Sequence, residues 1–238
     1  MNNLENIYNN NTKNISSDNN YLSFNDFIFS NDIKILGKLL HRYDYFNKVK
    51  DLPGDIVELG VFKGSGIATF SKFLEIYCPN SNKKIIGFDI FDTIKSNKIL
   101  DKYGDFDKNH MNIVYSRVKD TDLSLDSVNK RLENMNINKK YILVEGDVEE
   151  TLPKFLEENP GFRISMLYID VDLKRPTYNG LKYLWDRILP GGIILFDEYE
   201  YHKFSESDGV EQFLNERNIN YDIKSTNWMC PTAYLIKK

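Results

Sequence analysis

Two acidic motifs in the second half of the chain are the first candidates for chemistry. Asp170-Val-Asp172 follows the apolar run Leu167-Tyr-Ile, and Asp197-Glu198 follows the apolar run 193–196. If both runs are strands of one sheet, their acidic ends meet at one edge, and residues 170 and 172 point to the same side. Several carboxylates at one point suit a hard divalent cation such as Mg²⁺, which prefers oxygen ligands. The alternative is a solvated acidic rim that holds no metal.

A glycine-rich turn precedes these motifs. Gly60, Gly64 and Gly66 follow the predicted strand 55–59, which carries Glu58 near its end. Glycine lets the backbone pass close to a ligand and turn into a helix. The spacing G-x-x-x-G-x-G differs from the dinucleotide-binding pattern G-x-G-x-x-G, so a tight strand-to-helix turn without a ligand is the alternative.

Two further acids follow predicted strands. Asp89 ends the run 84–89, and Asp147 follows the run 141–144. An ionised carboxylate can accept hydrogen bonds from both hydroxyls of a ribose, which suits Asp89, whereas a helix cap or loop acid is the alternative. Carboxylates gathered at one sheet edge would repel one another and lose hydration. A cationic ligand or a metal would relieve that repulsion.

The loop after Asp197-Glu198 carries two candidate substrate contacts, Tyr199 and His202. Both lie near enough in sequence to reach a substrate bound at the acidic motifs. A single histidine is more often a surface or packing residue, and the tyrosine shares that ambiguity.

From Pro53-Gly54 onwards, apolar runs with strand character alternate with segments of helical spacing. The predicted strands cover residues 55–59, 84–89, 141–144, 164–170, 193–196, 221–224 and 233–236. The predicted helices lie around residues 32–46, 67–77, 125–135, 152–156 and 181–188, the last one closed by residues 190–192, and a final helix begins near residue 210. This alternation predicts an α/β fold, a mainly parallel seven-stranded sheet with helices on both faces and a C-terminal antiparallel strand pair.

Two parts of the chain stand apart from this alternation. Nine of the first twenty residues are Asn, so residues 1–20 are predicted to form a disordered tail. Residues 21–52 are predicted to be a helical lid or dimerisation segment, and residues 53–238 the main domain. The stretch 93–123 is polar and poorly periodic, which is typical of a long functional loop and makes it a candidate lid insertion.

Composition excludes several classes of protein. The chain has 238 residues, 41% of them hydrophobic, which is enough for one domain with a sizeable core. Its charge of −4, with 35 acids against 31 bases, argues against nucleic acid as the main partner. Two cysteines are too few for a disulfide framework, so packing is their predicted role. With no apolar membrane-spanning stretch and no signal-peptide core, the sequence predicts a cytoplasmic protein without membrane contact.

Five motifs in a fixed order resemble those of one enzyme family. They are Pro-Gly-Asp-Ile-Val-Glu-Leu-Gly-Val-Phe-Lys-Gly at 53–64, Gly-Phe-Asp-Ile-Phe-Asp at 87–92, Glu-Gly-Asp-Val-Glu-Glu-Thr-Leu-Pro at 145–153, Tyr-Ile-Asp-Val-Asp-Leu at 168–173 and Pro-Gly-Gly-Ile-Ile-Leu-Phe-Asp-Glu-Tyr at 190–199. Together they resemble the macrocin O-methyltransferase family. The resemblance implies a Rossmann-like class I methyltransferase fold, and an enzyme that uses S-adenosylmethionine and Mg²⁺ or another divalent cation to methylate a sugar hydroxyl.

The resemblance also implies a role for each matching residue. Glu58, Gly60, Gly64, Ser65 and Gly66 would line the methionine part of the cofactor, Asp89 would hold the ribose, and Asp147 would lie by the adenine. Asp170, Asp197 and Glu198 would bind the metal, and Asp172 would be the general base. Members of the family tend to form dimers or larger assemblies, so a homo-oligomer is also implied.

The chain departs from the family pattern at three places. Glu198 stands where the family usually has Asp, and its extra methylene changes the geometry or the choice of metal. Lys174 replaces a frequent aromatic residue, and the loop 200–208 differs as well. The resemblance therefore leaves the acceptor sugar open.

The leading hypothesis is a methyltransferase acting on a sugar nucleotide, a glycoside or a surface polysaccharide precursor. One alternative keeps the cofactor and changes the acceptor to a phenol, a catechol or an amine. A non-catalytic nucleotide-sugar binding module is a second alternative, against which the intact acids Asp170, Asp172 and Asp197 argue. A metal-dependent hydroxylase or hydrolase is a third.

Overall fold

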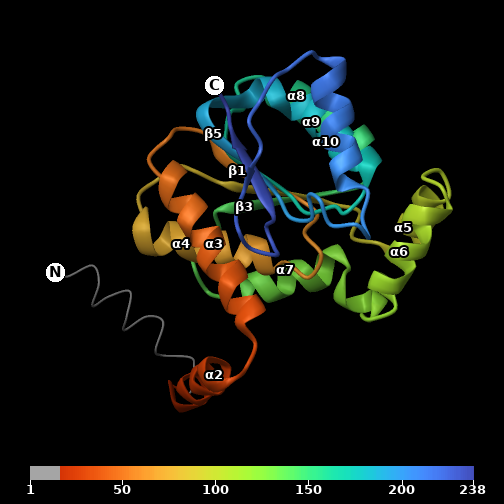
Figure 1. Ribbon diagram of the computed structural model, residues 1–238. Helices are drawn as coiled ribbons and strands as arrows, with labels where there is room; N and C mark the ends of the chain where they lie inside the picture. The colour runs from red at the N-terminus through yellow and green to blue at the C-terminus, as the bar shows by residue number, and fades with distance from the viewer. Residues whose placement is uncertain (1–16) are drawn as a thin grey trace. The chain divides into compact units, whose positions relative to one another are not determined.

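Figure 1 shows a computed structural model of the chain, which describes residues 17–238. The described chain divides after Gly37 into two compact units. The first unit contains helix α2 (Ser17–Phe29), and helix α3 (Ile33–Val49) begins in it and continues into the second. Residues 17–20 are therefore helical, which corrects the predicted disordered tail, because Ser and Asp commonly start helices. The rest of that predicted tail lies outside the described residues.

The second unit is built on one sheet whose seven strands follow the order β3-β2-β1-β4-β5-β7-β6. The strands are β1 (Asp55–Leu59), β2 (Ile85–Asp89), β3 (Tyr141–Glu145), β4 (Ile164–Ile169), β5 (Ile188–Phe196), β6 (Lys224–Ser225) and β7 (Ala233–Ile236). Strands β1 to β5 pair in parallel, whereas β7 runs antiparallel to both β5 and β6. The predicted parallel sheet with a C-terminal antiparallel pair is confirmed.

Helices cover both faces of the sheet (Figure 1). One face packs against α3, α4 (Ser65–Tyr77) and α7 (Leu125–Glu133), whose apolar residues share a core with Ile56 and Tyr168. The other face packs against α8 (Val148–Glu158), α9 (Lys174–Leu184) and α10 (Glu206–Glu216), around Val57 and Leu59. Since neighbouring strand residues point to opposite faces, Glu58 lies on the same face as Ile56 and so on the α3 side.

Several element boundaries differ from the prediction. The stretch 93–123 contains α5 (Thr93–Leu100), α6 (Asp105–Tyr115) and the short helix η1 (Asp120–Asp122), where the sequence predicted a poorly periodic connection. These helices are short, and α5 is stabilised at its start by Asp92, whose side chain accepts from two backbone amides. A small separate core of Leu100, Met111 and Leu173 holds α5 and α6. Because these apolar residues lie far apart in the sequence, they form no helical pattern that a prediction could use.

The segment Pro190–Gly192 also differs from its predicted role. It lies inside β5, where the pairing with β4 shifts in register, and it does not close the preceding helix. That helix ends at Leu184 and continues as a short turn, η2 (Trp185–Arg187). Of the predicted strand 221–224, only Lys224 is in a strand, the two-residue β6. Among the described residues, no helix is both long enough and apolar enough to cross a membrane.

Candidate active site

The carboxyl ends of β1, β4 and β5 meet at the acidic edge of the sheet. Backbone hydrogen bonds continue past the strands, from Asp170 N to Leu59 O at 2.8 Å and from Asp197 N to Ile169 O at 2.9 Å. A Cβ at Gly60 would lie 1.8 Å from the carbonyl oxygen of Asp170. Glycine is therefore required for β1 and β4 to approach this closely at their ends.

Two of the acids at this edge share one cation. The Lys38 Nζ lies 3.1 Å from Asp170 Oδ2 and 2.9 Å from Asp197 Oδ2. The second oxygen of Asp197 accepts a hydrogen bond from the Tyr168 hydroxyl at 2.5 Å. Burial and the neighbouring Asp197 raise the pKa of Asp170 to about 6. The two strand ends thus bring Asp170 and Asp197 together as the sequence predicted, and α3 supplies a cation that it did not.

A second ion pair joins Glu58 to Arg42, which lies one helical turn after Lys38 on α3. The Arg42 guanidinium lies 3.6 Å from Glu58 Oε1 and 3.9 Å from Asp170 Oδ2, and it stacks over the Tyr168 ring at 5.2 Å. Glu58 is 1% exposed, and burial raises its pKa to about 8. Its Oε2 is buried with no hydrogen-bond partner among the described residues. A buried carboxylate oxygen without a donor is costly, which is typical of a position that receives a donor from a ligand.

Asp172 lies just beyond β4 in a left-handed backbone conformation, with φ +63°. The predicted strand alternation, which placed residues 170 and 172 on one side, does not apply there because β4 has already ended at Ile169. Burial raises the pKa of Asp172 well above its usual value, and so do Asp170 and Glu198. This agrees with the predicted convergence of the acids, although the alternation that led to it was wrong.

Glu206, at the start of α10, is a further buried acid of this group. Its Oε1 accepts from the backbone amide of Glu198 at 3.1 Å, and its Oε2 has no hydrogen-bond partner among the described residues. Burial, together with Asp172 and Asp197, raises the pKa of Glu206 well above its usual value. Through its bond to the Glu198 amide, Glu206 supports the loop that carries Glu198.

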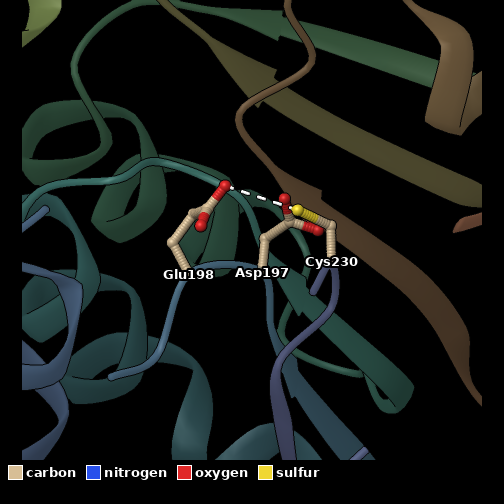
Figure 2. A group of neighbouring side chains, drawn as sticks. All are labelled: Asp197, Glu198 and Cys230. Carbon is tan, nitrogen blue, oxygen red and sulfur yellow. Dashed lines mark hydrogen bonds between the residues drawn. The ribbon is translucent and has the colours of Figure 1, made fainter. Parts of the chain in front are cut away.

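Figure 2 shows the neighbouring group formed by Asp197, Glu198 and Cys230. The Cys230 Sγ lies 3.5 Å from Glu198 Oε1, and one ligand atom from each of the three residues lies within 4.8 Å of the others. Burial and Asp197 raise the pKa of Glu198 to about 7. Two carboxylates and a thiol at these separations fit a divalent cation. Asp170 lies outside this group and meets Asp197 at the Lys38 ammonium.

The glycine-rich turn is held by Asp89 from β2. Its Oδ2 accepts from the amides of Val61 and Phe62, each at 2.8 Å, and its Oδ1 accepts from the Phe91 amide at 3.0 Å. Gly64 has φ +89° and leads directly into Ser65 and Gly66, the first residues of α4. A Cβ at Gly66 would lie 1.7 Å from Glu58 Oε1, so this glycine lets α4 pass beside the buried acid.

Asp147 is placed at the start of α8, after β3. Its side chain accepts from the backbone amide of Glu149 at 3.0 Å, which is an N-cap bond. Burial raises its pKa. The acid lies at the same sheet edge as Asp89, because β2 and β3 pair in parallel with Asp89 opposite Glu145.

The sequence profile of the macrocin-O-methyltransferase family (TylF) matches residues 40–234. The chain belongs to this family. Members of this family are O-methyltransferases, and so are the structurally similar proteins CalS11 and NovP, so the protein is a methyltransferase. No curated protein sequence matches the chain.

Solved structures share the fold of this macrocin-O-methyltransferase family member. CalS11, a calicheamicin methyltransferase, is 26% identical over 94% of this chain and 87% of its own, with a TM-score of 0.70. An apo structure of CalS11, described as a TDP-rhamnose 3′-O-methyltransferase of calicheamicin biosynthesis, is 27% identical over 84% of this chain and 79% of its own, with a TM-score of 0.61. The O-methyltransferase NovP is 18% identical over 84% of this chain and 79% of its own, with a TM-score of 0.66.

The fold likeness extends to a structure that contains S-adenosylmethionine. The O-methyltransferase TomG from Streptomyces achromogenes, in complex with that cofactor, is 14% identical over 85% of this chain and 80% of its own, with a TM-score of 0.52. These structures confirm the class I methyltransferase fold of the macrocin-O-methyltransferase family member.

The two candidate substrate contacts lie on the loop between β5 and α10. The Tyr199 hydroxyl donates to Glu211 on α10 at 2.5 Å, so its polar end is engaged in the protein. His202 is exposed, and its ring lies 5.1 Å from that of Tyr201. The Tyr199 hydroxyl is thus bonded to α10. The substrate contacts of Tyr199 and His202 stay predictions.

Sequence reasoning missed five residues of this region, Lys38, Arg42, Tyr168, Glu206 and Cys230. Lys38 and Arg42 are four apart in the predicted helix 32–46, so their shared face was visible, but nothing in the sequence placed that face over the acids. Cys230 was predicted to pack, and no spacing in the sequence connects it with Glu198.

Proposed function

We propose that this methyltransferase transfers the methyl group of S-adenosylmethionine to a hydroxyl of a sugar-containing acceptor, with the help of a divalent cation. The observation that carries the proposal is the meeting of Glu58, Asp170, Asp172 and Asp197 beside a glycine-rich turn. Membership of the macrocin-O-methyltransferase family supports it, and so does the similarity to CalS11, described as a TDP-rhamnose methyltransferase.

The proposed cofactor site runs along the ends of β1, β2 and β3. The unpartnered Oε2 of Glu58 is an acceptor suited to the ammonium of the methionine part, and Gly60, Gly64, Ser65 and Gly66 would let that part approach the backbone. Asp89 already accepts from three backbone amides, which leaves about one acceptor site of its carboxylate for a ribose hydroxyl. Asp147 would lie by the adenine, and the acidic site as a whole favours a sulfonium cation.

Asp170, Asp197 and Glu198 would hold the divalent cation. When bound, such a cation lowers the pKa of a coordinated hydroxyl and orients it. The neighbouring thiol of Cys230 adds a softer donor beside Glu198, so Mn²⁺ or another transition-metal ion fits this site as well as Mg²⁺.

Asp172 would be the general base. The hydroxyl oxygen attacks the methyl carbon, the carbon–sulfur bond breaks, S-adenosylhomocysteine leaves, and the hydroxyl proton passes to the Asp172 carboxylate. The raised pKa of Asp172 makes its carboxylate a stronger proton acceptor than an exposed aspartate. General base catalysis of this kind typically contributes roughly 10²–10⁴-fold to the rate.

The experiment that tests this role compares the native enzyme with Asp172→Asn. We expect turnover to fall by roughly 10²–10⁴-fold, because asparagine cannot accept the proton, while S-adenosylmethionine binding measured by calorimetry is retained. The matched control is Asp186→Asn, which makes the same change at a surface acid paired with Arg217 at 3.1 Å and leaves turnover unchanged. Full turnover by Asp172→Asn contradicts the assignment.

A further inference from the structure

Lys38 occupies the point at which two of the proposed metal ligands meet. Its Nζ lies within 3.1 Å of one carboxylate oxygen of Asp170 and 2.9 Å of one of Asp197. A metal bound by both residues would draw on the same two carboxylates. An ammonium and a divalent cation cannot share that position, because like charges at contact distance repel strongly.

The two cations on α3 differ in how firmly they are held. The Arg42 side chain is 6% exposed, faces both Glu58 and Asp170, and stacks on Tyr168. The Lys38 side chain is 26% exposed and ends in a single ammonium on a flexible stem. Arg42 is therefore fixed in the interior, whereas Lys38 has access to solvent and can leave without breaking the core.

The acids of this region outnumber their cations. Lys38 and Arg42 face a group of six interacting carboxyl groups, Glu58, Asp170, Asp172, Asp197, Glu198 and Glu206. The pKa of Lys38 is raised because Asp170 and Asp197 stabilise its charge more than burial opposes it. Removing Lys38 without replacement would leave Asp170 and Asp197 without a close counter-charge other than Arg42, which favours the entry of another cation.

We propose that Lys38 is an internal competitor of the divalent cation. Its ammonium neutralises Asp170 and Asp197 before metal binds, and metal binding displaces it toward solvent. The proposal rests on the proposed function, since it assumes that the same two carboxylates hold the metal. It adds that this chain sets its own metal affinity through one lysine of α3.

The direct test measures Mn²⁺ binding to the full chain without cofactor or acceptor. The electron paramagnetic resonance signal of free Mn²⁺ is the readout. Lys38→Met keeps the aliphatic stem and removes the charge. We expect its Mn²⁺ dissociation constant to fall at least tenfold below that of the native chain. Equal or weaker binding by Lys38→Met overturns the proposal, because the lysine would then be neutral toward the metal or needed to order its ligands.

The matched control is Lys50→Met. Lys50 directly follows the same helix, pairs with Asp51 at 2.7 Å and has a side chain 27% exposed, close to the exposure of Lys38. The control removes the same charge, and it leaves the Mn²⁺ affinity unchanged if the effect of Lys38 is local. A tenfold gain in Lys50→Met as well would reduce the result to net charge and overturn the proposal.

A second measurement uses the native chain and does not depend on the folding of a variant. Trace acetylation with acetic anhydride, read by peptide mass spectrometry, reports how accessible each amine is. Added Mg²⁺ or Mn²⁺ is expected to raise the acetylation of Lys38 several-fold relative to Lys50. An unchanged or lower ratio under conditions where metal binds overturns the proposal.

Asp170→Asn separates this proposal from the proposed function. If the native chain and Lys38→Met bind Mn²⁺ equally and Asp170→Asn abolishes binding, the metal site stands and the role of Lys38 fails. If none of these proteins binds Mn²⁺, the metal part of the proposed function and the role of Lys38 fail together.

Discussion

Asp172 combines an unfavourable backbone with an unfavourable side-chain environment. Its φ of +63° is a region that aspartate enters more readily than most residues, but still at a cost of order 1–3 kcal/mol. Its carboxyl group is surrounded by Asp170 and Glu198, which with burial raise its pKa. Strain of both kinds at one residue is typical of a functional site that the surrounding fold holds in place.

Replacing Asp172 with glycine is therefore expected to stabilise the fold while abolishing turnover. Glycine adopts a positive φ without strain, so the free energy of unfolding measured in urea should rise by about 1 kcal/mol despite the extra flexibility of the unfolded chain. The control is Asn218→Gly, at an Asn with φ +52° after α10, where a gain in stability is expected with no effect on turnover. A less stable Asp172→Gly would show that its carboxyl group contributes more to the fold than its backbone costs.

The candidate site was predictable where its residues follow strands and not where they come from elsewhere. Asp170 and Asp197 could be placed because apolar runs end directly before them, and parallel strands bring such ends to one edge. Lys38 reaches the same edge from a helix more than a hundred residues earlier, and that contact depends on how α3 packs. Cys230 reaches Glu198 from the loop before β7, which no local pattern encodes.

At the scale of elements, the close approach of β1 and β4 positions the site. The residue that allows it is Gly60, whose φ is +87° and whose missing side chain leaves room for the Asp170 carbonyl. The two strands pair in parallel along their whole length, from Asp55 to Leu59. A wider separation here would move Glu58 away from Asp170 and Arg42.

Gly60→Ala is expected to lower the free energy of unfolding by about 3 kcal/mol or more. The added Cβ meets a backbone oxygen, which cannot move away as a flexible side chain would. The matched control is Gly191→Ala, because Gly191 has a similar φ of +83° but nothing within 4 Å of its Cβ position, so only the cost of the backbone conformation, about 1 kcal/mol, is expected. Equal losses in urea unfolding would show that the approach of β1 to β4 is less tight than described.

Elements whose apolar residues are adjacent or regularly spaced in the sequence were predicted well, and elements whose buried apolar residues lack such a pattern were not. Strands β1, β2 and β7 fall within a residue of their predicted bounds because each contains adjacent apolar residues. Helices α5 and α6 were missed because their buried apolar residues do not recur at regular helical spacing in the sequence. These residues pack in a small core with Leu173, which lies far along the chain. Pro190 and Gly191 indicated a break in the chain, whereas the structure uses them for a register shift inside β5.

At the scale of the whole molecule, one edge of the sheet gathers an unusual number of acids. The overall charge is only −4, yet six interacting carboxyl groups gather where β1, β4 and β5 end. A buried lysine, Lys83, lies at the opposite edge of the sheet, where β1 and β2 begin. Its ammonium donates to Leu52 O at 2.7 Å and to Ser165 Oγ at 2.7 Å. Lys83 therefore joins loops and strands at the edge opposite the acids and does not neutralise them.

The most direct test of the central claim is the mass of sugar acceptors after incubation with the enzyme, S-adenosylmethionine and Mg²⁺. A panel of sugar nucleotides that includes TDP-rhamnose should contain an acceptor that gains the mass of one methyl group. The gain should disappear with a chelator, return with added divalent cation, and be absent with Asp172→Asn. Methylation of phenols, catechols or amines with none of the sugars, or methyl transfer that a chelator leaves unchanged, would contradict the account.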